Sequence, residues 1–488
     1  MSAELCYLSA ADALKRFKNR SLSPVELMQA VIDRCGQVNG PVNALTETYF
    51  DQALELARKS EERYILGKAK PLDGIPLAVK DEFRLKGTRR TSSSLVFRDR
   101  LDQETDVIID RLIRAGAICH AKTTTPEFCI LGSCHSRLWG VTGNPWNLDF
   151  TPGGSSGGSG AVLAAGMTTL ATGTDIGGSI RIPAAQCGVV GYKPPYGRNP
   201  EIPVFNLDFY SHSGPMTRSV VDAALMQNVM SGPHNQDIAS LRNPIRIDTE
   251  KTLGDLKGWR IAYSMDLGFM EIDTDVARNT RAAIDVFRGL GATVEEVDLG
   301  WTDEIIDAVH AYWAHTWVSA FSGLVKEHRD QLCDYTLYFV ENSARYTAED
   351  LHHSLEVAVR MYNTFGPLMD RYDLFLCPTL GTNRIPADFS WPSTGVVING
   401  KTVEVAEEHW SLTYPFNVLS RCPALSLPSG LADNGVPTAI QLVGQTFDDI
   451  RVFEGAKAYQ AAAPEVFQWQ LDQTILPGGK NHAHGIQS

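Results

Sequence analysis

Two serines that each follow a pair of glycines are the residues of this sequence best placed to do chemistry. They are Ser155, in Gly153-Gly154-Ser155, and Ser179, in Gly177-Gly178-Ser179. Glycines let the backbone turn tightly, so that consecutive N–H groups can converge on one point. A serine at the end of such a turn has its hydroxyl beside those donors, which is what acyl transfer needs. The stretch 151–183 is therefore predicted to be an active site, with Ser179 as its nucleophile.

A nucleophilic serine also needs a base, and the sequence offers two kinds of candidate. Lys80 ends a short apolar run, Leu77-Ala78-Val79, where burial would lower the pKa of the lysine towards neutrality and let it act as a base. Local sequence alone favours a surface lysine at position 80, because Asp81 and Glu82 follow it. Three histidines lie nearest to the glycine-rich stretch and stand in no motif: His120, His135 and His212.

Two other interpretations of the glycine-rich stretch fit less well. Residues 154–158 satisfy G-x-S-x-G, the nucleophile elbow of α/β-hydrolases, which would make Ser156 the nucleophile. An elbow should follow an apolar strand, but residues 147–152 (NLDFTP) make a poor one, and no convincing histidine follows. A phosphate-binding P-loop needs a lysine after its last glycine, and no lysine follows Gly160.

Strand and helix patterns alternate around these residues, as is typical of an α/β sheet. Asn399-Gly400 predicts the turn of a β-hairpin over 396–405. Residues 303–371 are almost entirely helical in pattern. The expected strands are 77–79, 117–120, 188–193, 258–264, 292–298 and 372–378. The other expected helices are 9–18, 24–35, 50–64, 106–116, 217–230, 274–290 and 449–463.

Composition excludes several classes of protein. The net charge is -13 and no basic stripe occurs, so nucleic acid is not an expected partner. Nine scattered cysteines without a C-x-x-C pair indicate reduced thiols in a cytoplasm. The N-terminus lacks the apolar core of a signal peptide, and no apolar run is long enough to span a membrane. There is no H-E-x-x-H motif, so neither a metal nor another cofactor is expected.

Several longer strings resemble the amidase signature family, and they extend over most of the chain from Pro71 to Gln445. They are PLAVKD (from Pro76), NPWN, TPGGSSGGSGAVLAAG, GTDIGGSIRIPAAQCGVVGYKP, GPMTRSVVDAAL, PALSLPSG and VPTAIQLVG. The resemblance implies an α/β fold with a large mixed, mostly parallel twisted sheet covered by helices on both faces. It implies a single domain over 1–478, with 479–488 as a disordered tail. The parts of that domain are N-terminal helices (1–68), a catalytic core (71–230), a variable, largely helical region around the substrate pocket (235–372) and a C-terminal sheet and helix (373–470).

The resemblance also implies a role for individual residues. Ser179 corresponds to the nucleophile, Ser155 to a serine that follows a cis peptide bond and relays protons, and Lys80 to the base. Asp175 and Arg181 correspond to residues that brace the nucleophile's loop. Ser156 matches a supporting hydroxyl. The oxyanion hole would consist of four backbone N–H groups: those of Ile176, Gly177, Gly178 and Ser179.

Some positions depart from the family pattern and suggest a substrate. Phe150 stands where the family often has arginine, Cys129 stands where it often has a small residue, and 199–213 is rich in aromatic residues. These loops line the substrate pocket in the family, so a pocket is expected that includes Phe128, Cys129, Phe150, Phe205 and Phe209. The alternative is that these residues anchor their loops in the core, and this explains each of them equally well.

The expected activity is hydrolysis of small hydrophobic or aryl amides, anilides or carbamates (urethanes), with ester hydrolysis as a further activity. The alternative is the glutaminase subunit of a tRNA-dependent amidotransferase. The N-terminal helices could form a homodimer surface.

Overall fold

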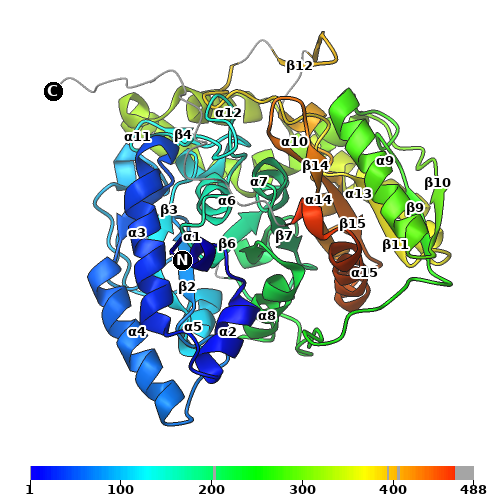
Figure 1. Ribbon diagram of the computed structural model, residues 1–488. Helices are drawn as coiled ribbons and strands as arrows, with labels where there is room; N and C mark the ends of the chain where they lie inside the picture. Colours follow the sequence, from blue (N-terminus) through cyan, green and yellow to red (C-terminus); the bar gives the residue numbers. More distant parts are fainter. Residues whose placement is uncertain (1, 202–204, 393–394, 404–406, 468–488) are drawn as a thin grey trace.

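Helices surround a central sheet of 11 strands in the computed structural model, which describes residues 2–201, 205–392, 395–403 and 407–467 (Figure 1). The strands of this sheet are β1 (Leu45–Thr48), β2 (Pro76–Lys80), β3 (Ile118–Thr123), β6 (Leu170–Asp175), β7 (Val190–Lys193), β8 (His212–Thr217), β9 (Arg260–Tyr263), β10 (Thr293–Glu296), β11 (Leu374–Pro378), β14 (Ala424–Leu431) and β15 (Pro437–Val443). The expected 479–488 tail lies outside the described residues.

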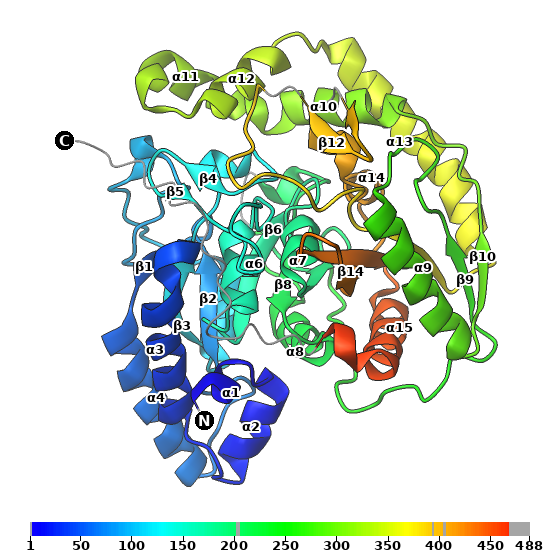
Figure 2. The ribbon, with the colours of Figure 1, turned by 45° about the horizontal axis from the view of Figure 1, so that its top comes forward.

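The helices are α1 (Ser2–Cys6), α2 (Ala10–Lys18), α3 (Pro24–Val42), α4 (Phe50–Ile65), α5 (Val107–Arg114), α6 (Gly157–Ala164), α7 (Arg181–Cys187), α8 (Val220–Met230), α9 (Thr274–Gly289), α10 (Glu304–Thr316), α11 (Ser322–His328), α12 (Asp334–Ser343), α13 (Ala348–Met369), α14 (Pro415–Val418) and α15 (Asp449–Ala462). Helices α10 to α13 group at the top of the molecule in Figure 2, and α1 to α4 group at the lower left. No helix among the described residues is long and apolar enough to cross a lipid bilayer.

The sheet is mixed, with the strand order β1-β3-β2-β6-β8-β7-β14-β15-β11-β9-β10. The expectation of a mostly parallel sheet is wrong, because only the pairs β2–β3, β2–β6, β9–β11 and β9–β10 are parallel. The remaining neighbours are antiparallel, and of these pairs only β14 and β15 are joined by a short turn. The parallel pair β2–β6 matters for the site, since parallel strands end at the same edge of a sheet.

Helices cover both faces of the sheet, as expected. Successive side chains of a strand point to opposite faces, and in β11 they enter two separate apolar cores. Phe375 and Cys377 pack in a core with residues of α7, α10 and α13. Leu374 and Leu376 pack in a core with residues of α8, α9 and α15. The whole of β11 is consequently buried, which explains its continuous apolar sequence.

Local capping signals explain several helix boundaries. Ser9 caps α2 by accepting a hydrogen bond from the N–H of Asp12. Ser23 and Glu26 form a capping box at the start of α3, which has Pro24 at its first position. The helix expected at 24–35 extends to Val42, and β1 was not expected. The predicted hairpin is present as β12 (Val396–Ile398) and β13 (Lys401–Val403), with the turn at Asn399-Gly400.

Candidate active site

Parallel pairing of β2 with β6 brings Lys80 to the glycine-rich stretch. Lys80 is the last residue of β2, and Asp175 is the last residue of β6. The backbone N–H of Lys80 donates to Thr172 Oγ1 over 3.2 Å, which holds the two strand ends together. The lysine side chain is fully buried. The interpretation of Lys80 as a surface residue is therefore wrong.

Lys80 and Ser155 are in direct contact. The lysine Nζ donates to Ser155 Oγ over 2.8 Å, and the Gly154–Ser155 peptide bond is cis, as the resemblance implies. Gly154 packs directly against the backbone of residues 131–133, because a Cβ atom on Gly154 would be 2.4 Å from the carbonyl oxygens of both Leu131 and Ser133. No other residue type fits at this position, so the sequence motif has a steric cause.

The second serine turn lies directly against the first. Ser156 N–H donates to the carbonyl oxygen of Ser179 over 3.1 Å, and the Ser156 hydroxyl accepts from Thr174 N–H over 3.3 Å. The Ser156 side chain thus ties its own turn to β6 and is fully buried. Ser179 is 9% exposed. Of the two candidate nucleophiles, Ser179 is the one whose side chain borders a cavity.

The electrostatic surroundings of Lys80 differ from the expectation of a neutral lysine. Burial alone would lower the pKa of Lys80, but interactions with Cys129 and with the Glu82 carboxylate outweigh it, and the pKa is raised. Lys80 Nζ lies 3.1 Å from Glu82 Oε2. Burial also raises the pKa of the Cys129 thiol, to about 12, so the thiol is protonated at neutral pH. Glu82 is therefore the anion that keeps the lysine charged.

Asp175 and Arg181 brace the loop that carries Ser179. Both side chains are fully buried, and the guanidinium donates to both carboxylate oxygens over 3.0 Å. Arg181 also donates to the carbonyl oxygen of Thr413 and to the side chain of Asn417. Burial by itself would raise the pKa of Asp175, but Arg181 and Asn417 hold the pKa of this carboxyl well below its usual range. The loop is thereby fixed to the C-terminal part of the chain.

Replacing Asp175 by asparagine is expected to lower the free energy of unfolding at pH 7 by about 3–5 kcal/mol, because the buried charge of Arg181 loses its carboxylate. Since the pKa of Asp175 is lowered in the folded protein, the stabilisation is complete above the unfolded pKa of about 3.9 and declines at lower pH. The difference in the free energy of unfolding between the parent and the variant should therefore become smaller as the pH falls below about 3.9. Urea denaturation at pH 7 and pH 3.5 measures both effects, and equal stability at pH 7 would contradict the assigned role.

The expected oxyanion hole needs one correction. Gly178 N–H donates to Asp175 Oδ1 over 2.8 Å and is not available to a substrate oxygen. The N–H groups of Ile176, Gly177 and Ser179 have no acceptor within the described part of the chain. Gly178 has a φ of +129°, and a Cβ atom there would be 1.9 Å from Thr413 Oγ1. Its role is to let the turn close.

Aromatic side chains from the helical region form the wall of the cavity beside Ser179. The lining residues are Cys129, Ile130, Leu131, Gly132, Ile176, Gly177, Ser179, Ile182, Trp313, Trp317, Phe339, Ser411 and Tyr414. Trp313 packs against the loop that carries Ser179, since its Cζ2 atom would be 2.6 Å from a Cβ atom on Gly177. Trp313 belongs to α10, and Phe339 belongs to α12.

Only one of the five expected pocket residues, Cys129, lines this cavity. Phe128 instead stacks on Phe321 in the core, and Phe150 pairs through its backbone with Pro386. Phe205 and Phe209 are 38% and 46% exposed. Sequence reasoning missed Trp313, Trp317 and Phe339; the aromatic richness of 301–372 was the available signal, but periodicity does not tell which face of a helix meets the site.

The three nearby histidines form their hydrogen bonds with groups other than Ser179: His120 contacts Thr168 Oγ1, and His135 contacts the carbonyl oxygen of Phe389. Burial lowers the pKa of His120 to about 4 and that of His212 to about 3, and it also lowers the pKa of His135. His212 contacts the backbone oxygens of Asp175 and Ser420. Among the described residues, no cluster of three His, Cys, Asp or Glu side chains could hold a metal ion.

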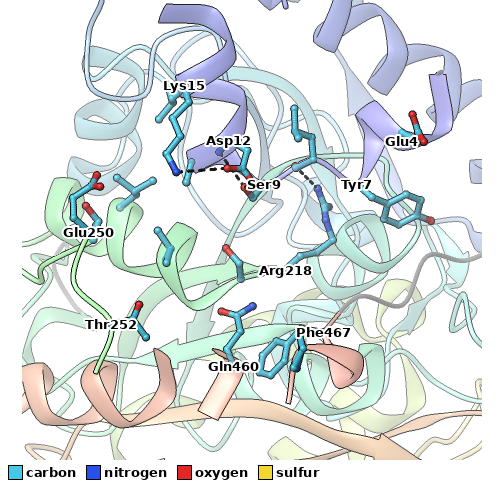
Figure 3. A pocket seen from close by; sticks show the side chains of 18 of the residues that line it. Glu4, Tyr7, Ser9, Asp12, Lys15, Arg218, Glu250, Thr252, Gln460 and Phe467 are labelled. Atoms are coloured by element: carbon cyan, nitrogen blue, oxygen red, sulfur yellow. Dashed lines mark hydrogen bonds and ion pairs between the residues drawn. The ribbon is translucent and has the colours of Figure 1, made fainter. Parts of the chain in front are cut away.

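A wide groove lies elsewhere on the molecule, between α2, α8 and the end of α15 (Figure 3). Its volume is about 920 Å³, and it contains neither Lys80 nor the two serines. Arg218 lies beside it and donates to the carbonyl oxygens of Leu8, Leu163 and Thr168. The arginine is thus engaged in joining the N-terminal segment to the core.

Comparison with known proteins agrees with this geometry. The family model described as Amidase matches residues 26–453. The chain belongs to the amidase family. This amidase is 33% identical to an acylamidase of Rhodococcus erythropolis, over 97% of its own length and 99% of that protein. It is 31% identical to a glutamyl-tRNA(Gln) amidotransferase subunit of Geotalea daltonii, over 94% and 97% of the two chains.

Among solved structures, this amidase resembles a bacterial aryl acylamidase of the amidase signature family, with a TM-score of 0.85 and 29% identity over 94% of its own chain and 98% of the other. The similarity therefore extends over the whole fold as well as over the motifs. The protein is an amide-hydrolysing enzyme of the amidase signature family.

Proposed function

We propose that this amidase hydrolyses small hydrophobic or aryl amides and anilides through Ser179, Ser155 and Lys80. The observation that carries the proposal is the 2.8 Å hydrogen bond between Lys80 Nζ and Ser155 Oγ, in a turn bonded to that of Ser179. Lys80, once neutral, accepts a proton from Ser155 as Ser155 accepts one from Ser179. Ser179 then attacks the carbonyl carbon and forms a tetrahedral oxyanion.

Backbone donors stabilise that oxyanion. The N–H groups of Ile176, Gly177 and Ser179 lie in the turn that Asp175 and Arg181 brace, and they are the proposed donors. Collapse of the intermediate breaks the C–N bond, and Ser155 returns a proton to the leaving nitrogen. Water then releases the acyl group from Ser179 by the same relay run in reverse. No step requires a metal ion or another cofactor.

The cavity supports an apolar acyl group. Its wall consists of Trp313, Trp317, Phe339 and aliphatic side chains, and large apolar side chains of this kind favour hydrophobic or aromatic ligands. The similar acylamidase and aryl acylamidase carry names that agree with such substrates. Carbamates and esters have the same carbonyl geometry and are proposed as further substrates.

Reduced, free cysteines are consistent with a cytoplasmic location.

A substrate panel tests the proposal. The purified chain should release an aniline from a nitroacetanilide and from anilides with larger acyl groups, without any partner. The second candidate function is a glutaminase subunit, which the 31% identity to an amidotransferase subunit favours. Release of ammonia from glutamine, and no cleavage of any anilide, would support that alternative and contradict the proposal.

Trp313→Ala is expected to widen the acyl pocket, because the indole ring forms the wall beside Gly177. The ratio of kcat/KM for a bulky acyl anilide over that for the acetanilide should rise by about tenfold or more. Initial rates with the two substrates on one enzyme preparation measure the ratio, which does not depend on the fraction of folded enzyme. An unchanged ratio would show that the acyl group binds elsewhere.

A further inference from the structure

Three acceptors surround the amine of Lys80. Besides Ser155 Oγ at 2.8 Å, Nζ contacts Thr174 Oγ1 at 2.6 Å and Glu82 Oε2 at 3.1 Å. An ammonium group has three N–H donors, so the site matches a protonated lysine. Thr174 in turn donates its hydroxyl hydrogen to Glu82 Oε2 over 2.5 Å. Two paths, one direct and one through Thr174, thus join Lys80 to a carboxylate.

A protonated lysine cannot accept a proton, so the resting arrangement lacks a base. The proton has to leave Nζ before Ser155 can be deprotonated. Solvent is a poor receiver, because the Lys80 side chain is fully buried. The Glu82 carboxylate is in contact with Nζ, and the Glu82 side chain is 26% exposed.

We propose that Glu82 receives the proton of Lys80, so that the base of the enzyme is a Lys80–Glu82 pair that shares one proton. This inference rests on the proposed function. Glu82 is not among the residues that line the cavity beside Ser179 and acts through Lys80, so it is a positioning residue that also holds a proton. Nothing in the family's serine and lysine motif assigns it a role.

The proton balance of the cycle closes without an external acid or base. A proton moves from Lys80 Nζ to Glu82, either directly or by exchange through the Thr174 hydroxyl, which leaves a neutral amine and a neutral carboxylic acid. The amine then takes the proton that Ser155 passes on from Ser179, and it returns this proton to the leaving nitrogen. Acylation and deacylation both proceed with Glu82 protonated. Once Ser179 has regained its own proton, Glu82 returns its proton to Lys80.

The charged groups around Glu82 are compatible with this exchange. Burial alone would raise the pKa of Glu82, but Lys80 and the hydrogen bond from Thr174 lower it, so the resting form is the carboxylate. Cys129 faces both partners, with a thiol whose pKa burial and Glu82 raise to about 12. Burial and the nearby Glu82 carboxylate raise the pKa of Glu201 to about 8. Lys80 is the charged group in contact with Glu82, at 3.1 Å.

Glu82→Gln tests the proposal through the pH profile. Glutamine keeps an oxygen for Lys80 and Thr174 but cannot take up a proton. In the parent, kcat should fall only at acidic pH, where Glu82 is itself protonated. In the variant, the proton of Lys80 can leave only to solvent. The acid limb of the profile, the range in which kcat falls as the pH is lowered, should therefore move to higher pH. Below the pKa of Lys80, kcat should decrease about tenfold per pH unit, and it should recover at alkaline pH.

The opposite outcome would overturn the proposal. If Glu82 merely kept the lysine charged, its removal would lower the pKa of Lys80, and the acid limb would move to lower pH. An unmoved limb would overturn the proposal as well. Glu82→Asp should restore part of the parent profile, because it restores a carboxylate. Glu47→Gln is the matched control, since Glu47 is likewise a mostly buried carboxylate paired with a cation, Arg89, away from the site; its profile should equal that of the parent.

A second measurement separates this inference from the proposed function. The rate at which a fluorophosphonate modifies Ser179 depends on the same base but on no amide substrate. If no amide is cleaved, the proposed function fails, and the labelling rate of Glu82→Gln against pH still tests the pair. The same shift of the acid limb is expected in the labelling rate, and its absence there overturns the pair whatever the substrate.

Discussion

Turnover is expected to disappear when Ser179 is replaced by alanine, with a loss of kcat on the order of 10⁶-fold, as found when the nucleophile of a serine hydrolase is removed. The reason is that, of the three serines in the two glycine turns (Ser155, Ser156 and Ser179), only Ser179 lines the cavity. Anilide hydrolysis at substrate saturation measures the loss. In parallel, a fluorophosphonate should add its mass to a peptide of the parent that contains Ser179, and to no peptide of the variant.

Ser231→Ala is the control for this experiment. Ser231 is as buried as Ser179, at 9% exposure, and its hydroxyl has no hydrogen-bond partner in the described part of the chain. Its replacement should leave kcat unchanged. Near-normal activity of Ser179→Ala would show that another residue is the nucleophile. A fluorophosphonate label on Ser156 would favour the nucleophile-elbow interpretation.

The second large effect is expected for Lys80→Ala, with a loss of kcat of about 10³-fold or more, because removal of the base disables the whole relay. The fully buried lysine is the only cation in contact with Ser155 among the described residues. The rate should no longer rise with pH in the way that the parent's acid limb does. Fluorophosphonate labelling of Ser179 should slow by a similar factor.

A double variant checks that Lys80 and Ser155 work together. Groups that act as one unit give non-additive losses, so Lys80→Ala combined with Ser155→Ala should be within about tenfold of the single lysine variant. Additive losses would show that the two side chains act in separate steps. A parent-like pH profile of Lys80→Ala would contradict the role of the lysine as the base.

Most of the fold could be predicted from local patterns, because strands such as β11 are apolar throughout and helices such as α3 carry their own capping residues. The direction of strand pairing could not. Whether two neighbours such as β7 and β14 run antiparallel depends on connections that are hundreds of residues apart. β1 was missed because its sequence, Leu-Thr-Glu-Thr, is short and only half-buried.

The residues of the site that belong to the sequence motifs could be predicted. Lys80, Ser155 and Ser179 are brought to one place, and Asp175 with Arg181 braces the loop. The charge state of Lys80 could not be predicted, because the sequence does not reveal that the side chain of Glu82 turns back towards that of Lys80. The hydrophobic wall was assigned to the wrong loops for a similar reason. Trp313 of α10, Trp317 just after that helix and Phe339 of α12 lie more than 100 residues further along the chain.

The close packing of Trp313 on Gly177 has an evolutionary consequence. A residue that shapes the acyl pocket also supports the peptide unit whose N–H is proposed to bind the oxyanion, since there is no room between the indole and the glycine for even one methyl group. A mutation at Trp313 that admits a new substrate therefore also disturbs the loop that accelerates the reaction. New specificities should arise more readily at Trp317 or Phe339, which line the same cavity, because the atoms nearest to a Cβ atom on Gly177 all belong to Trp313. In lineages that descend from this chain, position 313 should change late and together with the catalytic loop.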